Sequence, residues 1–316
     1  MNDLVTDVKS LELETLKNLK SSKALNTLRA YKADYKDFVS FCVKNGFKPM
    51  PSEPKIISLY LTYLSKSCKF STLKRRLASI SVIHRMSGHY IDTKHPMITE
   101  NLMGIKRIKG SYQKAKKPIL IEDLKFLIDV IDQRLVHNRN LDGIYQKQEN
   151  KFIRDKAIIL IGFAGGFRRS ELVNIEYEDI EFVTEGVKIF VKRSKTDQSG
   201  EGMTKAIPYL AKSNYCPVLS LKEWINKSEI KSGKIFDMSD KSVALTIKKY
   251  TAIAGLDSNK YSGHSLRSGF ATSTAELGAE ERSIMAMTGH KTTQMVRRYI
   301  QEANLFKNNA LNKIKL

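Results

Sequence analysis

The chain has 316 residues, 41% of them hydrophobic, which is enough for two domains that each bury a core. Its formal net charge of +21 at pH 7 implies a polyanionic partner, either nucleic acid or an anionic membrane surface. The sequence has no apolar run of about 18 residues and no apolar block typical of a signal peptide, which argues against membrane-spanning and secreted classes and favours nucleic acid.

The positive charge is concentrated in the first third of the chain. Residues 1–117 carry 23 lysines and arginines against 9 acidic residues, a net charge of +14, whereas residues 118–316 carry 31 against 24, a net charge of +7. A single basic run is usually only a solvated surface, but this asymmetry predicts a double-stranded DNA-binding domain over residues 1–110. The cysteines Cys42, Cys68 and Cys216 indicate neither a disulfide framework nor a zinc site, and they suit a reducing cytoplasm.

Apolar residues at helical spacing predict a helical bundle in this first domain. The expected helices cover residues 5–19, 27–45, 55–67, 71–86 and 101–108. The last two of these helices carry basic residues that are candidates for contacts with DNA phosphates: Lys74, Arg75, Arg76, Lys106, Arg107 and Lys109. A short basic linker over residues 111–118 follows, and its Lys114, Lys116 and Lys117 are further candidates.

The second domain, residues 119–316, is predicted to be mainly helical with one β-hairpin. Its expected helices cover residues 121–135, 152–163, 219–224, 243–253, 265–277, 280–288, 292–300 and 302–314. Residues 136–150 are polar and predict an exposed loop, with or without a short helix, and residues 235–236 predict a short strand. Apolar and polar residues alternate on either side of a turn within residues 186–206, which predicts the hairpin. The expected fold class is mainly α, with a helical first domain and an α+β second domain.

Four polar side chains follow one another near the end of the chain. His264 and Arg267 are three residues apart and share one face at the start of an expected helix. His290 follows Gly289 just past the next helix, and Tyr299 lies nine residues later. Each has an ordinary explanation when taken alone, because a tyrosine on an apolar helix face is usually core and His-x-x-Arg often arises by chance. The combination at this spacing is much more specific.

The segments that carry these residues read SGHSLRSGFAT and TGHKTTQMVRRYI. They resemble the C-terminal signature of the tyrosine recombinases, also called the phage integrase family, and in particular the Cre-like integrases. The resemblance implies that His264, Arg267 and His290 are catalytic residues and that Tyr299 is the nucleophile. It also implies a helical core-binding domain before the catalytic domain, which agrees with the order of the predicted helices.

Two upstream motifs extend the resemblance. The segment GGFRRSELVNI matches a family box, which makes Arg168 the first catalytic arginine and Glu171 its supporting acid. Without the resemblance this pair would be an ordinary surface ion pair at a helix start. Family members also place a catalytic lysine in the hairpin, and the sequence S-K-T around Lys195 matches its setting. Lys192 and Lys205 are the alternatives for this role.

These residue types suit the transfer of a phosphodiester. A tyrosine phenol has an unperturbed pKa of about 10, so it needs a proton acceptor or nearby cations to attack at neutral pH. Two arginines can hold the non-bridging phosphate oxygens in place of a metal ion. In family terms, Tyr299 forms a 3′-phosphotyrosine bond, Lys195 protonates the 5′-oxygen, His264 accepts the tyrosine proton and His290 hydrogen-bonds the phosphate. No metal-ligand motif is present, and we expect no cofactor and no ATP requirement.

The sequence therefore predicts a site-specific DNA recombinase that integrates or excises a mobile element. An Xer-like chromosome dimer resolvase and a type IB topoisomerase are the alternatives, and a DNA-binding protein with an inactive site is disfavoured because every catalytic position is filled. The resemblance implies a homotetramer on two DNA sites, with a dimer on each, and it allows for accessory DNA-bending or directionality factors. Residues 302–314 carry the apolar face expected of a helix exchanged between protomers. We expect the protein in the cytoplasm, on the nucleoid.

Overall fold

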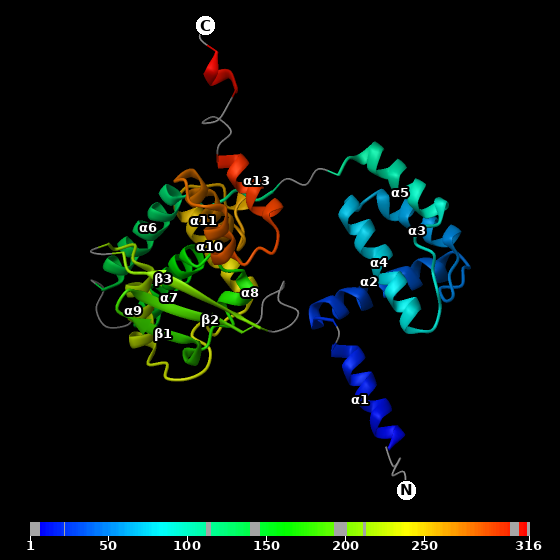
Figure 1. Ribbon diagram of the computed structural model, residues 1–316, viewed down its shortest axis with the longest axis horizontal. Helices are drawn as coiled ribbons and strands as arrows, with labels where there is room; N and C mark the ends of the chain where they lie inside the picture. The colour runs from blue at the N-terminus through cyan, green and yellow to red at the C-terminus, as the bar shows by residue number, and fades with distance from the viewer. Residues whose placement is uncertain are drawn as a thin grey trace. The chain divides into compact units, whose positions relative to one another are not determined.

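The computed structural model describes residues 7–21, 23–111, 115–139, 146–192, 201–210, 213–303 and 310–314. The chain divides into two compact units, Met1–Lys114 and Ala115–Leu316, with the boundary inside the segment expected as a linker (Figure 1). Each unit encloses its own cluster of buried apolar side chains. The expected mainly α fold is confirmed, with one small antiparallel sheet in the second unit. No helix in the described ranges is long and apolar enough to cross a membrane.

The first unit is a bundle of helices, in which α2 packs against α4 and α3 against α5. The helices are α1 (Val8–Ser21), α2 (Leu25–Lys44), α3 (Pro54–Ser65), α4 (Phe70–Met86) and α5 (Pro96–Lys109). Aromatic and aliphatic side chains at helical spacing fill the core, among them the fully buried Phe38, Tyr60 and Leu73. Helix α5 begins five residues earlier than expected, because Pro96 occupies its first turn and the His95 ring accepts a hydrogen bond from the Met97 N–H.

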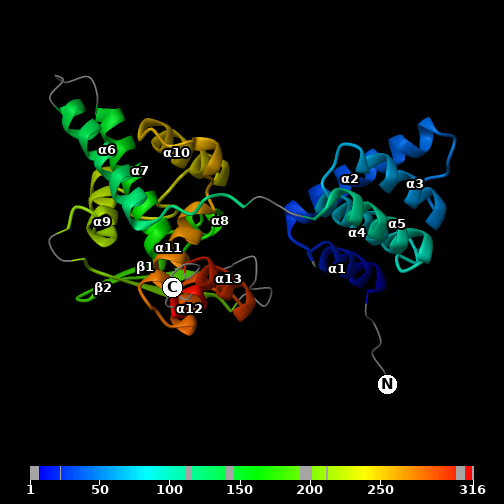
Figure 2. The same ribbon diagram turned by 90° about the horizontal axis from the view of Figure 1, so that it is seen from above.

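The second unit is built around α7, which packs against α6, α9 and α11. Its long helices are α6 (Ile121–Arg139), α7 (Gln146–Ala164), α9 (Pro217–Ser228), α10 (Asp240–Ile253), α11 (Ser265–Glu276), α12 (Glu281–Thr288) and α13 (Thr293–Ala303). Short helical turns complete it: α8 (Arg169–Leu172), η1 (Tyr177–Asp179), η2 (Ser258–Lys260) and η3 (Ala310–Lys313). Helices α11, α12 and α13 contact one another, so the last three expected motifs come together in space (Figures 1 and 2).

The sheet of the second unit has the strand order β1-β2-β3, with both pairs antiparallel. The expected hairpin corresponds to β2 (Gly186–Val191) and β3 (Met203–Pro208), and the alternation of Val187, Ile189 and Val191 into the core is confirmed. Strand β1 (Ile180–Val183) was not predicted, because its four residues carry only a short apolar signal. It pairs along its full length with β2, from Ile189 back to Gly186.

Three sequence predictions in this unit differ from the structure. Residues 136–150, expected as an exposed loop with or without a short helix, are helical at both ends, since α6 continues to Arg139 and α7 begins at Gln146; the buried Leu135 anchors the first extension. Residues 235–236 do not form the expected strand, and an isolated bridge pairs the preceding Lys234 with Glu176. Residues 302–314 are not one helix either. Ala303 ends α13, residues 304–309 lie outside the described part, and Ala310–Lys313 form a single 3-10 turn. Leu311 and Ile314 are about 60% exposed, so apolar burial does not stabilise a longer helix there.

Candidate active site

Arg168 is presented by a tight turn at the end of α7. Gly166, whose φ of +53° favours glycine, reverses the chain between Ala164 and the buried Phe167. The carboxylate of Glu171 then holds Arg168 twice, because it accepts a bond from the Arg168 backbone N–H at 2.9 Å and one from its Nη1 at 2.5 Å. The side chain of Glu171 is only 1% exposed. Backbone and guanidinium of Arg168 are therefore fixed by one buried acid.

Arg267 lies in the first turn of α11, three residues after His264, as the spacing predicted. Its side chain is fully buried, and its Nη1 donates a hydrogen bond to the Gly166 carbonyl at 2.8 Å. Its Nε and Nη2 atoms are buried and have no hydrogen-bond partner among the described residues. Buried donors of this kind are normally satisfied, so this guanidinium presents two donors for a missing acceptor.

His290 is oriented by the end of α12. Gly289 adopts the left-handed conformation that ends the helix, and His290 follows it. The hydroxyl of Thr288 donates its proton to the Ile284 carbonyl at 2.6 Å, and it lies 2.8 Å from Nδ1 of His290. Because a hydroxyl has one proton, Nδ1 of His290 is the donor in the second bond. The Nε2 atom of this ring is therefore the one available to a ligand.

Helix α13 carries Tyr299 and is anchored by Val296, which is fully buried against α11 and α12. The Tyr299 hydroxyl lies 3.5 Å from Nε2 of His264, and its ring centroid lies 6.0 Å from that of His290. The structure thus brings together five of the residues that the sequence singled out: Arg168, His264, Arg267, His290 and Tyr299. Lys195, the sixth, lies outside the described residues, within 193–200.

The site is strongly electropositive. Burial, reinforced by the charge of Arg168, lowers the pKa of Arg267 to about 10. Burial and the charges of Arg267 and Arg168 lower the pKa of His290 to about 4. Desolvation of the ring and the nearby arginines also lower the pKa of His264, although this side chain still reaches solvent. Both histidines are therefore neutral at pH 7, and the cluster of cations favours an anionic ligand.

The two alternatives to Lys195 have different surroundings. Lys192 is half exposed and forms ion pairs with Glu176 and, at 3.0 Å, with Asp179. Lys205 is 1% exposed and lies beneath the site, 3.9 Å from Glu171. Sequence reasoning considered Lys205 only as a proton donor, and it missed Thr288 altogether. The signal for Lys205 was present, since it lies two residues before the apolar Ile207 on β3 and therefore on the same inward face of the strand.

The basic residues of the first unit fall into two groups. Lys74, Lys106, Arg107 and Lys109 are exposed. Arg75, which is also exposed, and the largely buried Arg76 form ion pairs within the bundle, with Asp34 and Asp37 respectively. Arg76 also donates a hydrogen bond to the Tyr60 hydroxyl at 2.7 Å. Lys114 lies outside the described residues, whereas Lys116 and Lys117 are exposed and belong to the second unit. DNA contact by any of these residues stays a prediction.

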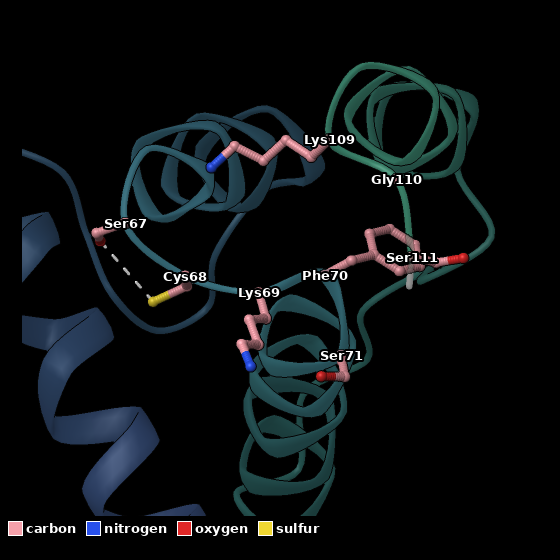
Figure 3. A pocket seen from close by; sticks show the side chains of 8 residues that line it. All are labelled: Ser67, Cys68, Lys69, Phe70, Ser71, Lys109, Gly110 and Ser111. Carbon is pink, nitrogen blue, oxygen red and sulfur yellow. Dashed lines mark hydrogen bonds between the residues drawn. The ribbon is translucent and has the colours of Figure 1, made fainter. Parts of the chain in front are cut away.

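A pocket of about 360 Å³ opens in the first unit between the start of α4 and the end of α5 (Figure 3). It is lined by Ser67, Cys68, Lys69, Phe70, Ser71, Lys109, Gly110 and Ser111. Lys109, one of the predicted DNA contacts, is part of this lining.

In the described ranges of both units, no group of three or more histidine, cysteine or acidic side chains is arranged to hold a metal ion.

A buried guanidinium with two partnerless donors, next to a partly buried tyrosine, is the arrangement expected of an enzyme that attacks a phosphodiester through tyrosine. Residues 134–305 match the family model described as the phage integrase family. A protein of Selenomonas ruminantium named integrase/recombinase xerD homolog is 41% identical over 328 aligned residues, which cover 99% of this chain and 92% of that protein. The chain belongs to the phage integrase, or tyrosine recombinase, family, and it is an enzyme that cleaves and rejoins DNA strands.

Solved structures with a similar fold include recombinases bound to DNA. The XerH site-specific recombinase, in a post-cleavage complex with palindromic difH substrate, has a TM-score of 0.58 at 17% identity, covering 82% of this chain and 73% of that chain. A lambda integrase tetramer bound to a Holliday junction has a TM-score of 0.55 at 18% identity, covering 99% and 81%. At these identities the likeness shows the fold, which is the one that the sequence predicted.

Proposed function

We propose that this recombinase integrates or excises a mobile element at specific DNA sites through a 3′-phosphotyrosine intermediate. The observation that carries the site assignment is the pair of partnerless buried donors on Arg267, because a phosphodiester supplies the acceptors that the described residues lack. An Xer-like resolvase is the second candidate, favoured by the name of the 41% identical relative. The two candidates share the chemistry and differ in their target sites.

Each residue of the site is proposed to have one role in cleavage. Arg168 and Arg267 hold the non-bridging oxygens of the scissile phosphate, with Arg168 fixed by Glu171. Neutral His264, 3.5 Å from the phenol, accepts the proton as Tyr299 attacks phosphorus. An anionic phosphate offsets the neighbouring positive charges and favours protonated His290, which donates from Nε2. The 5′-hydroxyl leaves, and a second 5′-hydroxyl reverses the step without ATP.

The proposal is tested by trapping the intermediate on genomic DNA. Purified protein is incubated with sheared DNA of its source organism in excess EDTA, covalent adducts are recovered after denaturation, and the attached ends are sequenced. We expect adducts through the 3′-phosphate at a small set of sites. Sites at the ends of an inserted element support integration or excision, and a single chromosomal site supports resolution of dimers. Absence of adducts, or adducts only without EDTA, contradicts the proposed chemistry.

Lys195 is proposed to protonate the leaving 5′-oxygen. Lys195→Ala is expected to slow cleavage of an ordinary nicked substrate by about 10²- to 10⁴-fold, the usual contribution of a general acid. A substrate with a 5′-bridging sulfur has a leaving group that needs no proton, so its cleavage by Lys195→Ala should be close to the wild-type rate. Lys192→Ala is the matched control, because Lys192 is paired with Glu176 and Asp179, and it should cleave both substrates normally. Equal loss on both substrates in Lys195→Ala would exclude this role.

We further propose that strand exchange takes place in a homotetramer on two DNA sites, with a dimer on each site. The support is the family to which the chain belongs and the tetrameric lambda integrase of similar fold. A contribution of the C-terminal tail to assembly rests on Leu305, Phe306, Ala310, Leu311 and Ile314, of which the first two lie outside the described residues. Leu311 and Ile314 are exposed and therefore accessible to a neighbouring protomer. We also propose that the protein acts on the nucleoid, because its proposed target sites are chromosomal.

A further inference from the structure

A buried lysine beneath the candidate site has no role in the chemistry described above. Lys205 lies on the inward face of β3, and its side chain is excluded from solvent. Its ammonium donates hydrogen bonds to the Gly165 carbonyl at 2.6 Å and to the Met287 carbonyl at 2.7 Å. It also lies 3.9 Å from Oε2 of Glu171 and 4.3 Å from the centroid of the Phe167 ring. A lysine buried this completely needs such partners, because an unpaired buried charge is costly.

The two carbonyls belong to the segments that carry two of the proposed catalytic residues. Gly165 directly follows α7, three residues before Arg168, and Met287 lies near the end of α12, three residues before His290. One ammonium group therefore joins the two segments through two hydrogen bonds. A weaker contact, from Nη2 of Arg168 to the Gly289 carbonyl at 3.4 Å, joins the same segments directly.

Lys205 also completes the surroundings of Glu171. That carboxylate binds the backbone and the guanidinium of Arg168, and the ammonium of Lys205 is a second cation beside it. Arg267 binds the Gly166 carbonyl, next to the Gly165 carbonyl that Lys205 binds. Two cations from β3 and α11 thus hold adjacent carbonyls of the turn that presents Arg168.

We infer that Lys205 is a positioning residue for the proposed cleavage reaction, which holds the segments of Arg168 and His290 at a fixed separation. It does not touch DNA, because its ammonium is enclosed by the protein. An apolar residue at this place leaves the carbonyls of Gly165 and Met287 without a donor and lets the two segments separate. A displacement of about 1 Å at a reacting group slows an enzyme by about 10²-fold.

The charge of Lys205 makes this restraint sensitive to pH. Burial lowers the pKa of Lys205 to about 7; Glu171 opposes this shift, and Arg267 and Arg168 add to it. His290, at the end of α12, also faces this charge. The ammonium is thus lost as pH rises through its folded-state pKa, and the neutral amine is a weaker donor to both carbonyls. The restraint is strongest at low pH and weakens on the alkaline side.

The inference rests on the proposed function, and its test uses the full-length protein with nicked substrates built from the mapped adduct sites. Lys205→Met removes the charge at similar length, Lys205→Arg keeps it, and Lys188→Met is the control, since Lys188 is an exposed lysine on the neighbouring strand. We expect Lys205→Met to cleave about 100-fold more slowly on both the ordinary and the 5′-bridging-sulfur substrate. Lys205→Arg should recover most of the rate, and Lys188→Met should equal the wild type.

The pH profile separates positioning from mere stability. A guanidinium stays charged where the Lys205 ammonium is lost, so the ratio of the wild-type rate to the Lys205→Arg rate should fall as pH rises from 6 to 9. A constant ratio overturns the inference, and this measurement decides alone if Lys205→Met does not fold. A Lys205→Met rate within twofold of the wild type also overturns it, and so does rescue by the sulfur substrate, which would make Lys205 the proton donor. Failure of the proposed function itself is distinguishable, because the wild type then forms no adduct.

Discussion

Tyr299→Phe is expected to bind the mapped target DNA with the wild-type affinity and to form no covalent adduct on a nicked substrate. The hydroxyl is the group that we propose attacks phosphorus, and phenylalanine keeps the ring that packs against α11 and α12. Removal of the nucleophile abolishes the covalent intermediate, so a denaturing gel should show no detectable protein–DNA adduct. Gel shifts measure binding on the same samples.

Tyr261→Phe is the matched control for this prediction. Tyr261 is the other tyrosine near the motif, but it is 1% exposed and its hydroxyl bonds to the Asp123 carboxylate at 3.2 Å. Its loss should lower the free energy of unfolding by about 1 kcal/mol and leave adduct formation intact. Adducts formed by Tyr299→Phe but not by Tyr261→Phe would assign the nucleophile to Tyr261 instead.

Arg267→Met is expected to slow cleavage by about 10³-fold without lowering the thermal midpoint Tm. Loss of one preorganised donor to a transition-state oxyanion already slows an enzyme by about 10²- to 10³-fold, and Arg267 offers two partnerless donors. Burial holds the pKa of Arg267 at about 10, below the 12.5 of a free arginine, so the charged form destabilises the fold by roughly 3 kcal/mol. The lost bond to the Gly166 carbonyl offsets only about 1 kcal/mol of this.

The sign of the stability change is fixed by the direction of that shift. Below the folded-state pKa of about 10, both the folded and the unfolded chain carry the charge, so the penalty is fully present at pH 7 and methionine removes it. Arg134→Met, at an exposed position on α6, should change neither the cleavage rate nor Tm. Rates come from adduct formation and Tm from calorimetry. A large drop in Tm for Arg267→Met would mean that the guanidinium mainly supports the fold.

Much of the site was predictable because its residues lie in local motifs. His264 and Arg267 share one helical turn, so their spacing alone placed them together, and Gly289 marked the helix end that presents His290. The helices of both units followed from apolar periodicity, since most of their inward positions are aliphatic or aromatic. Resemblance to the family then linked these motifs with Arg168, which is distant in the sequence.

The other features of the site and of the first unit depend on tertiary contacts, which a local sequence pattern does not reveal. Lys205 meets the carbonyls of Gly165 and Met287, which are 40 and 82 residues away in the sequence. Thr288 fixes His290 through a hydroxyl that looks, in sequence, like an ordinary helix residue. The ion pair of Arg75 with Asp34 joins two helices of the first unit across 41 residues of sequence. The sequence alone therefore did not show that a basic residue on α4 is already paired within the bundle.

The first residues of the second unit are attached to the segment that leads into α11. The Lys117 N–H donates to the Lys260 carbonyl at 2.7 Å, and the Ile119 N–H donates to the Ser265 carbonyl at 2.9 Å. Gly269 permits this path, because a β-carbon there would lie 1.8 Å from the Ile119 carbonyl oxygen. Tension on the polypeptide before Ala115 is therefore transmitted to the first turn of α11. A pull on that segment must break these bonds or shift the backbone that carries His264 and Arg267.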